Sequence, residues 1–88
     1  MKRVPNAEEN RLLIKEGTLL MAGDNFYKVS YISRDDEHNI SRVTVDCMGT
    51  DYDTLRTQTH HSAIAIGLFS YIVVEEQKKW RKILEDEE

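Results

Sequence analysis

The chain has 88 residues but only one cysteine, one proline and no apolar run long enough to cross a bilayer. The single cysteine, Cys47, excludes an intramolecular disulfide and is typical of a reducing compartment. The longest apolar stretch, residues 63–74, is interrupted by Gly67 and Ser70. Charged residues stand near the N-terminus where a signal peptide needs an apolar run. These absences predict a cytoplasmic protein with no membrane partner.

The chain has no basic excess, because 16 acidic side chains outnumber 12 basic ones and give a formal net charge of −4. Nucleic-acid binders neutralise phosphates with basic side chains, so this balance disfavours a nucleic-acid partner. Only four residues suggest a face for one: Arg42, Arg56, Tyr27 and Tyr31. The acidic residues are concentrated in residues 35–53, where Arg42 is the only basic residue, and in residues 85–88. A solvated loop and a frayed terminus explain both segments better than nucleic-acid mimicry.

The short chain also limits how a fold is stabilised. A small domain buries a modest share of its surface and is often supplemented by a disulfide, a metal or oligomerisation. The single cysteine excludes the disulfide, and no zinc-type ligand spacing is visible. No repeat and no linker composition interrupts residues 1–88. We therefore expect a single domain that forms a homo-oligomer.

Two helices are predicted from capping signals. Asn6 and Glu9 have the spacing of a capping box, and Gly17 is a natural end for the helix that follows. Ser62 can cap a short helix over residues 63–66. The alternative for that segment is a strand, and the short helix is favoured.

A terminal helix is predicted over residues 76–85. Trp80, Ile83 and Leu84 recur at the spacing of one helical face and form an apolar stripe. Core packing of this stripe is favoured, since a small chain needs its apolar residues. A homo-oligomer or partner interface is the alternative, because tryptophan is enriched in binding hot spots.

Strands are predicted over residues 18–22, 26–32, 40–48, 55–59 and 70–75. In the second of these, Tyr27, Val29 and Tyr31 share a face. In the third, Val43, Val45 and Cys47 point inward, and Arg42, Thr44 and Asp46 point outward. The apolar character of the last strand predicts burial on both faces. The fold class is therefore α+β and β-rich, a curled antiparallel sheet of four or five strands with a helix at each end.

Two resemblances extend this prediction. A glycine strand ending Met21-Ala22, then Phe26-Tyr27-Lys28-Val29, then Val43-Thr44-Val45-Asp46 before Gly49 make residues 17–52 similar to small SH3-like barrels of the Tudor type. In layout, the helix running into Gly17, the polar Thr57-Gln58-Thr59 turn and the strand Tyr71-Ile72-Val73-Val74-Glu75 resemble phage anti-Thoeris proteins. The first resemblance implies a small barrel. The second implies an oligomer that sequesters a signalling nucleotide.

One segment has the composition of an anion site. It contains Arg56, Thr57, Thr59, His60, His61 and Ser62 just before the predicted short helix. A helix N-terminus offers unpaired amides to an anion, and Arg56 can bind a phosphate through two hydrogen bonds. The simpler alternative, an exposed strand edge followed by an ordinary cap, is favoured.

Metal and catalytic chemistry are poorly supported. Zinc accepts the side chains of Cys47, His60, His61 and Asp46, but their spacing fits no zinc pattern. A nucleophilic pair of Cys47 and His60 with Asp53 requires an exposed thiolate, whereas the strand period places Cys47 inward. Ser62 lacks the strained turn of a hydrolase serine. We expect no metal, no cofactor and no enzymatic activity.

Two functions remain. The first is a binding or regulatory module that acts on a protein partner through its acidic hairpin and strand edges, as an inhibitor from a phage or other mobile element. The alternative is a protein that sequesters an anionic nucleotide with residues 56–62.

Overall fold

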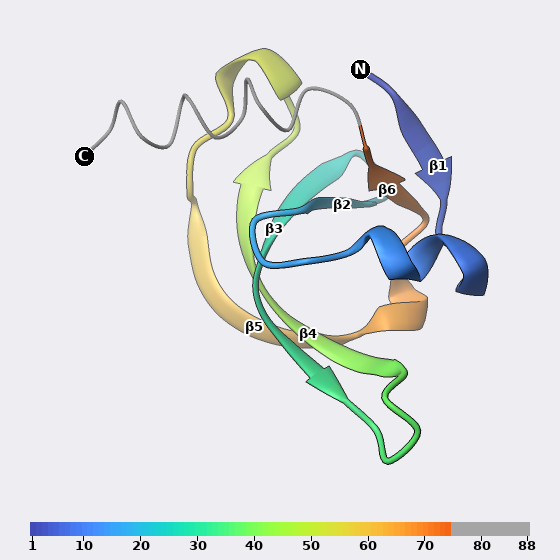
Figure 1. Cartoon of the computed structure of the whole chain (residues 1–88). Helices are drawn as coiled ribbons and strands as arrows, with labels where there is room; N and C mark the ends of the chain where they lie inside the picture. Colours follow the sequence, from blue (N-terminus) through green and yellow to red (C-terminus); the bar gives the residue numbers. More distant parts are fainter. Residues whose placement is uncertain (75–88) are drawn as a thin grey trace.

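A computed structural model describes residues 1–74 of the chain. Within them the chain forms six strands and three short 3-10 helices (Figure 1). They are β1 (Arg3–Pro5), η1 (Glu8–Leu13), β2 (Leu19–Ala22), β3 (Asn25–Arg34), β4 (Ile40–Gly49), η2 (Tyr52–Thr54), β5 (Thr59–Ala65), η3 (Ile66–Leu68) and β6 (Tyr71–Val73). The β-rich class is confirmed, and four of the five predicted strands are found as β2, β3, β4 and β6.

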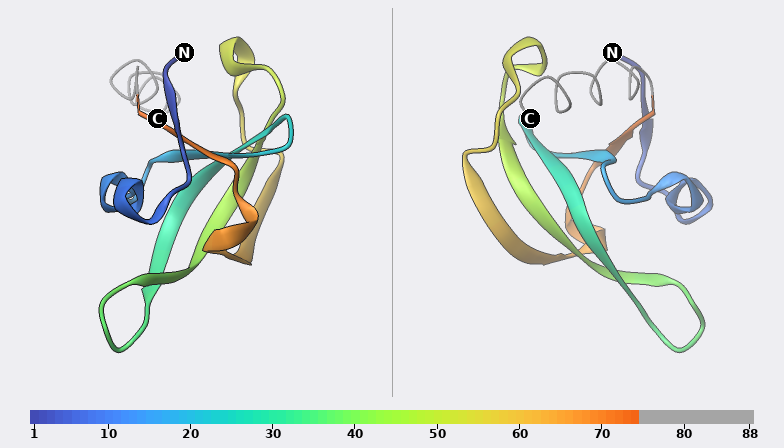
Figure 2. Two further views of the ribbon diagram at one scale, coloured as in Figure 1. Left: turned by 90° about the vertical axis from the view of Figure 1, so that its right-hand side faces the viewer. Right: turned by 60° about the vertical axis from the view of Figure 1, so that its left-hand side comes forward.

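All six strands form one antiparallel sheet in the order β1-β6-β2-β3-β4-β5. The sheet curls, and the β3–β4 hairpin projects from it (Figure 2). It does not close, so β1 and β5 are its edges within the described residues. The expected four or five strands become six because Val4 of β1 pairs with Ile72 of β6. Arg3 also lies over the Tyr71 ring, 4.1 Å from its centroid.

Turn chemistry sets the two hairpins. Ala22 pairs with Asn25, which leaves a two-residue turn that starts at Gly23 with a φ of 61°. Glycine at the first turn position is typical of a type II′ hairpin. At the β3–β4 tip, Asp35 Oδ1 accepts hydrogen bonds from the amides of Glu37 at 2.9 Å and Asn39 at 3.0 Å. The predicted turn and polar tip are therefore confirmed.

A β-bulge in β3 changes which of its side chains share a face. Val29 pairs with Val45 and Tyr31 pairs with Thr44, which are consecutive residues of β4. Ser30 is therefore an extra residue between them. Tyr27 and Val29 pack in one core cluster, but Tyr31 is 59% exposed. The prediction that all three share a face is wrong for Tyr31, because periodicity does not register an inserted residue.

The strand β4 follows its predicted phase through Val43 and Val45, which are buried. Beyond them burial differs from the prediction. Asp46 is only 5% exposed, whereas Cys47 is half-buried. Asp46 is in register with Lys28 of β3, and Lys28 Nζ lies 3.8 Å from Asp46 Oδ2. The carboxylate is therefore buried beside a cation instead of facing solvent.

Apolar side chains are buried on both faces of the sheet. The first cluster contains Ile14, Leu20, Val29, Ile40, Val43, Val45, Ile66, Phe69 and Ile72. The second contains Leu19, Met21, Phe26, Met48, Leu55 and Val73. Because neighbouring strand residues point to opposite faces, β2 and β6 each contribute to both clusters. This confirms that the last strand is buried on both sides. We call the face that carries the first cluster the first face, and the opposite one the second face.

The prediction of an N-terminal helix that begins at Asn6 and ends at Gly17 is wrong. The segment forms the 3-10 helix η1, with Ala7 at its N-cap and no side-chain cap. The side chain of Asn6 does not cap η1, because its Nδ2 donates to the carbonyls of Ile66 at 2.8 Å and Phe69 at 2.9 Å. The expected capping residue instead fastens the N-terminal segment to η3.

The short helix predicted over residues 63–66 is also wrong, as is the strand over residues 55–59. The strand β5 begins at Thr59 and continues to Ala65, and η3 follows. Ile64 is in register with Val43 and packs against the first cluster, so strand pairing overrides the local capping signal of Ser62. The helix predicted over residues 76–85 lies outside the described residues.

Candidate functional site

The segment predicted to bind an anion, residues 56–62, begins in a loop and continues into the strand β5. Arg56, Thr57 and Gln58 precede β5, and the Gln58 amide donates to the Cys47 carbonyl at 2.7 Å. The strand then contains Thr59, His60, His61 and Ser62. Because β5 continues through Ser62 to Ala65, Ser62 does not stand at the start of a helix. The backbone amides expected to bind an anion there are therefore not presented.

Arg56 lines a hollow of about 270 Å³ at the end of β4. Its other lining residues are Gly49, Thr50, Asp51, Thr54 and Gln58. Asp51 Oδ1 accepts a hydrogen bond from the Asp53 amide at 2.9 Å and so caps η2. The hollow thus holds one guanidinium and one carboxylate. Of the predicted segment's candidate site residues, it includes Arg56 alone.

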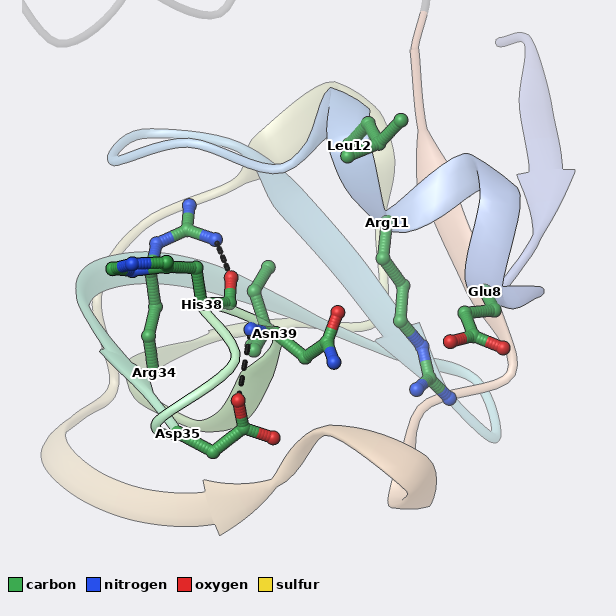
Figure 3. Close-up of a pocket in the computed structure, with 8 residues that line it drawn as sticks. Glu8, Arg11, Leu12, Arg34, Asp35, His38 and Asn39 are labelled. Atoms are coloured by element: carbon green, nitrogen blue, oxygen red, sulfur yellow. Dashed lines mark hydrogen bonds between the residues drawn. The ribbon is translucent and has the colours of Figure 1, made fainter.

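A hollow of about 220 Å³ lies between η1 and the tip of the β3–β4 hairpin (Figure 3). It is lined by Glu8, Arg11, Leu12, Arg34, Asp35, His38, Asn39 and Ile40. Arg11 Nε donates to Asn6 Oδ1 at 3.0 Å, and an Arg34 nitrogen donates to the His38 carbonyl at 3.0 Å. The lining contains two guanidinium groups and two carboxylates, so it has no excess of either charge. The sequence alone does not reveal this hollow, because its walls come from distant segments.

Groups suited to metal or catalytic chemistry are dispersed in the described part of the chain. No three histidine, cysteine or acidic side chains gather there. Asp46 is occupied by its ion pair with Lys28, and Cys47 is a half-buried free thiol. These observations add no support for a metal centre or a nucleophilic cysteine.

The direction of backbone groups in β4 follows from two hydrogen bonds. The Cys47 carbonyl accepts from Gln58, which leads into β5, and the Thr44 carbonyl accepts from the Ser30 hydroxyl of β3 at 3.0 Å. Backbone groups of successive strand residues alternate between the two neighbouring strands. Cys47 and Val45 therefore direct their groups toward β5, whereas Thr44 directs its groups toward β3.

The free edge of β5 can be assigned from this alternation. Ala63 pairs with Thr44 and Ala65 pairs with Arg42, and both β4 partners direct their backbone groups toward β3. Ala63 consequently turns its N–H and C=O groups away from β4, and Ala65 does the same with its N–H. The Ala65 carbonyl belongs to the start of η3, because Ala65 is the N-cap residue of that helix. No described strand pairs with that side of β5. Within residues 1–74, the edge thus presents donors and an acceptor that no other strand pairs, as edge strands do.

The composition of β5 and the residues around it gives this edge little protection against strand pairing. Residues 57–74 contain no Asp, Glu, Lys, Arg or Pro. Natural sheets commonly protect an edge with charged side chains, proline or a covering element. Ala63 and Ala65 are exposed and carry only a methyl group, so a further strand meets little steric resistance.

The second face beside this edge displays Tyr31 and Arg42. Tyr31 lies in one cross-strand row with Thr44 and Ala63, and Arg42 lies in the next row with Ala65. Tyr27 instead packs edge-on against Phe69 in the first cluster, with ring centroids 5.7 Å apart. Of the four residues suggested for a nucleic-acid face, Tyr31 and Arg42 are therefore neighbours on this face, whereas Tyr27 lies on the opposite one.

The predicted interface residues Trp80, Ile83 and Leu84 lie outside the described residues. Within residues 1–74, no helix is long and apolar enough to span a membrane. Comparisons with protein-family models, curated proteins and solved structures find no match to the chain.

Proposed function

We propose that this chain is a small, non-enzymatic binding module that takes up an extended segment of a protein partner beside β5. One observation carries the proposal: the N–H and C=O groups of Ala63 and the N–H of Ala65 point outward from an edge strand without Asp, Glu, Lys or Arg. In strand addition, main-chain hydrogen bonds supply affinity and neighbouring side chains supply specificity. The edge of β5 offers both.

The acidic hairpin expected to contact the partner contributes less to this proposal. The Asp35 carboxylate already accepts two backbone hydrogen bonds within the loop, so it serves the hairpin itself. The strand edge is the stronger of the two predicted contact surfaces. The SH3-like resemblance, a homo-oligomer and an origin as a phage or mobile-element inhibitor of a host protein remain predictions.

Removing one outward amide tests the edge. Ala65 has a φ of −59°, close to the value that proline imposes, so Ala65→Pro fits the strand while deleting an N–H. We expect an unchanged urea midpoint and at least about tenfold weaker binding of peptides selected from a random display library. Fluorescence anisotropy with labelled peptides measures the affinity.

Ala65→Ser is the matched control, because it changes the same side chain but keeps the amide. It should bind the selected peptides as the natural chain does. Equal affinity of the Ala65→Pro variant would remove β5 from the binding site. A concentration-dependent dimer that Ala65→Pro abolishes would assign the edge to a second copy of the chain instead.

A second candidate function is the sequestration of an anionic nucleotide, favoured by the hollow beside Arg56. Thr50, Thr54 and Gln58 line the same hollow and carry hydroxyl and amide groups that can bind an anion. Arg56 would hold a phosphate through paired hydrogen bonds.

Calorimetric titration with ADP tests this second function. We expect Arg56→Ala to weaken ADP binding about tenfold or more, since a charged hydrogen-bond partner is removed. Lys15→Ala removes an exposed cation elsewhere and should leave the affinity unchanged. No heat from the natural chain, or equal heats from the natural chain and the Arg56→Ala variant, would contradict the nucleotide site.

A further inference from the structure

Arg42 is an available cation next to the free edge. It is exposed on β4, in register with Ser33 on one side and Ala65 on the other. Among the described residues it has no hydrogen-bond or ion-pair partner through its side chain. By contrast, Lys28 on the same sheet is paired with Asp46. Arg42 is also the only basic residue among residues 35–53.

The geometry of a sheet brings Arg42 within reach of an added strand. Neighbouring strands are spaced about 4.8 Å apart, so a residue beyond Ala65 stands roughly 10 Å from the Arg42 Cα atom. The methyl group of Ala65 leaves the second face open between them. An extended arginine and an aspartate or glutamate together span this interval. Their planar groups favour two parallel hydrogen bonds.

The neighbouring residue Ile64 sets a different requirement on the first face. It is half-buried, lies in register with Val43 and packs against the first cluster. An apolar side chain opposite Ile64 would continue that cluster at the unclosed side of the sheet and remove further apolar surface from water. Adjacent residues of the added strand thus meet opposite chemical surroundings.

We infer that the segment bound beside β5 carries an acidic residue opposite Ala65, held by Arg42, next to an apolar residue opposite Ile64. This inference rests on the proposed function and adds the chemistry of the partner to it. Arg42 acts as a specificity determinant, and the backbone groups of Ala63 with the N–H of Ala65 supply the sequence-independent contacts.

Selection from the same random peptide library tests the inference. Peptides selected by the natural chain should be enriched in an acidic residue beside an apolar one. The Arg42→Ala variant should bind these peptides about fivefold more weakly, as expected for the loss of a partly exposed ion pair. Arg42→Glu should select lysine or arginine at that position. Lys15→Glu makes the same charge change between η1 and β2 and should keep the acidic preference.

The outcomes separate the inference from the function. If Ala65→Pro abolishes binding but Arg42→Glu retains the acidic preference, the edge binds peptides and the role of Arg42 is wrong. If Ala65→Pro has no effect, or no peptide is selected, the proposed function fails and the inference fails with it. A reversed preference in Arg42→Glu, together with sensitivity to Ala65→Pro, supports both.

Discussion

Ile72→Ala should lower the free energy of unfolding by about 2–5 kcal/mol, the usual range for deleting a buried branched side chain. Ile72 is fully buried in the first cluster, and its strand stands between β1 and β2. It pairs with Val4 and Leu20, so the cavity would open where three strands meet. Urea unfolding followed by circular dichroism measures the loss.

Leu68→Ala is the control for this substitution. Leu68 is 69% exposed on η3, so its truncation should change stability by less than about 0.5 kcal/mol. Ile72→Val should fall between the two variants, at about 0.5–1.5 kcal/mol. Equal stabilities of the Ile72→Ala and Leu68→Ala variants would show that β6 is not buried between β1 and β2.

Asn6→Ala should cost about 2–4 kcal/mol of stability, because three side-chain hydrogen bonds disappear together. Its Nδ2 donates to the carbonyls of Ile66 and Phe69, and its Oδ1 accepts from Arg11 Nε. Removal would leave two part-buried carbonyls without this donor and release η1 from η3. The same urea titration measures the effect.

Two variants distinguish this role of Asn6 from helix capping. Asn10→Ala deletes one exposed bond to the Pro5 carbonyl, at 3.0 Å, and should cost less than about 1 kcal/mol. Asn6→Asp keeps a good capping residue but loses both donors, so it should be about as unstable as Asn6→Ala. A near-neutral Asn6→Asp would favour capping and contradict the attachment to η3.

Local sequence signals predicted β2, β3 and β4, which pair as hairpins close in the chain, and also β6, which an apolar run marks although its partners are distant. Alternating side chains marked β3 and β4, and the glycine at position 23 marked the turn before β3. The signals failed where distant segments decide the structure. Asn6 has the sequence pattern of a helix cap but binds carbonyls around η3. The three residues of β1 carry too little pattern to be recognised before they pair with β6.

The candidate site was predictable only in part. The composition of residues 56–62 indicated an exposed strand edge, and β5 begins at Thr59 within this segment. The direction of the Ala63 and Ala65 amides depends on pairing with β4, which the sequence does not encode locally. The exposure of Tyr31 depends on the extra residue Ser30, whose insertion alternation cannot reveal.

Amide hydrogen exchange at β5, followed by NMR, tests the central claim most directly. In the free monomer, the Ala63 and Ala65 amides should exchange rapidly, while Ile64, which faces β4, should be protected. Saturation with a selected peptide should slow exchange at both alanines. Protection of Ala63 and Ala65 already in the free monomer, or unchanged exchange in the complex, would contradict a partner strand at this edge.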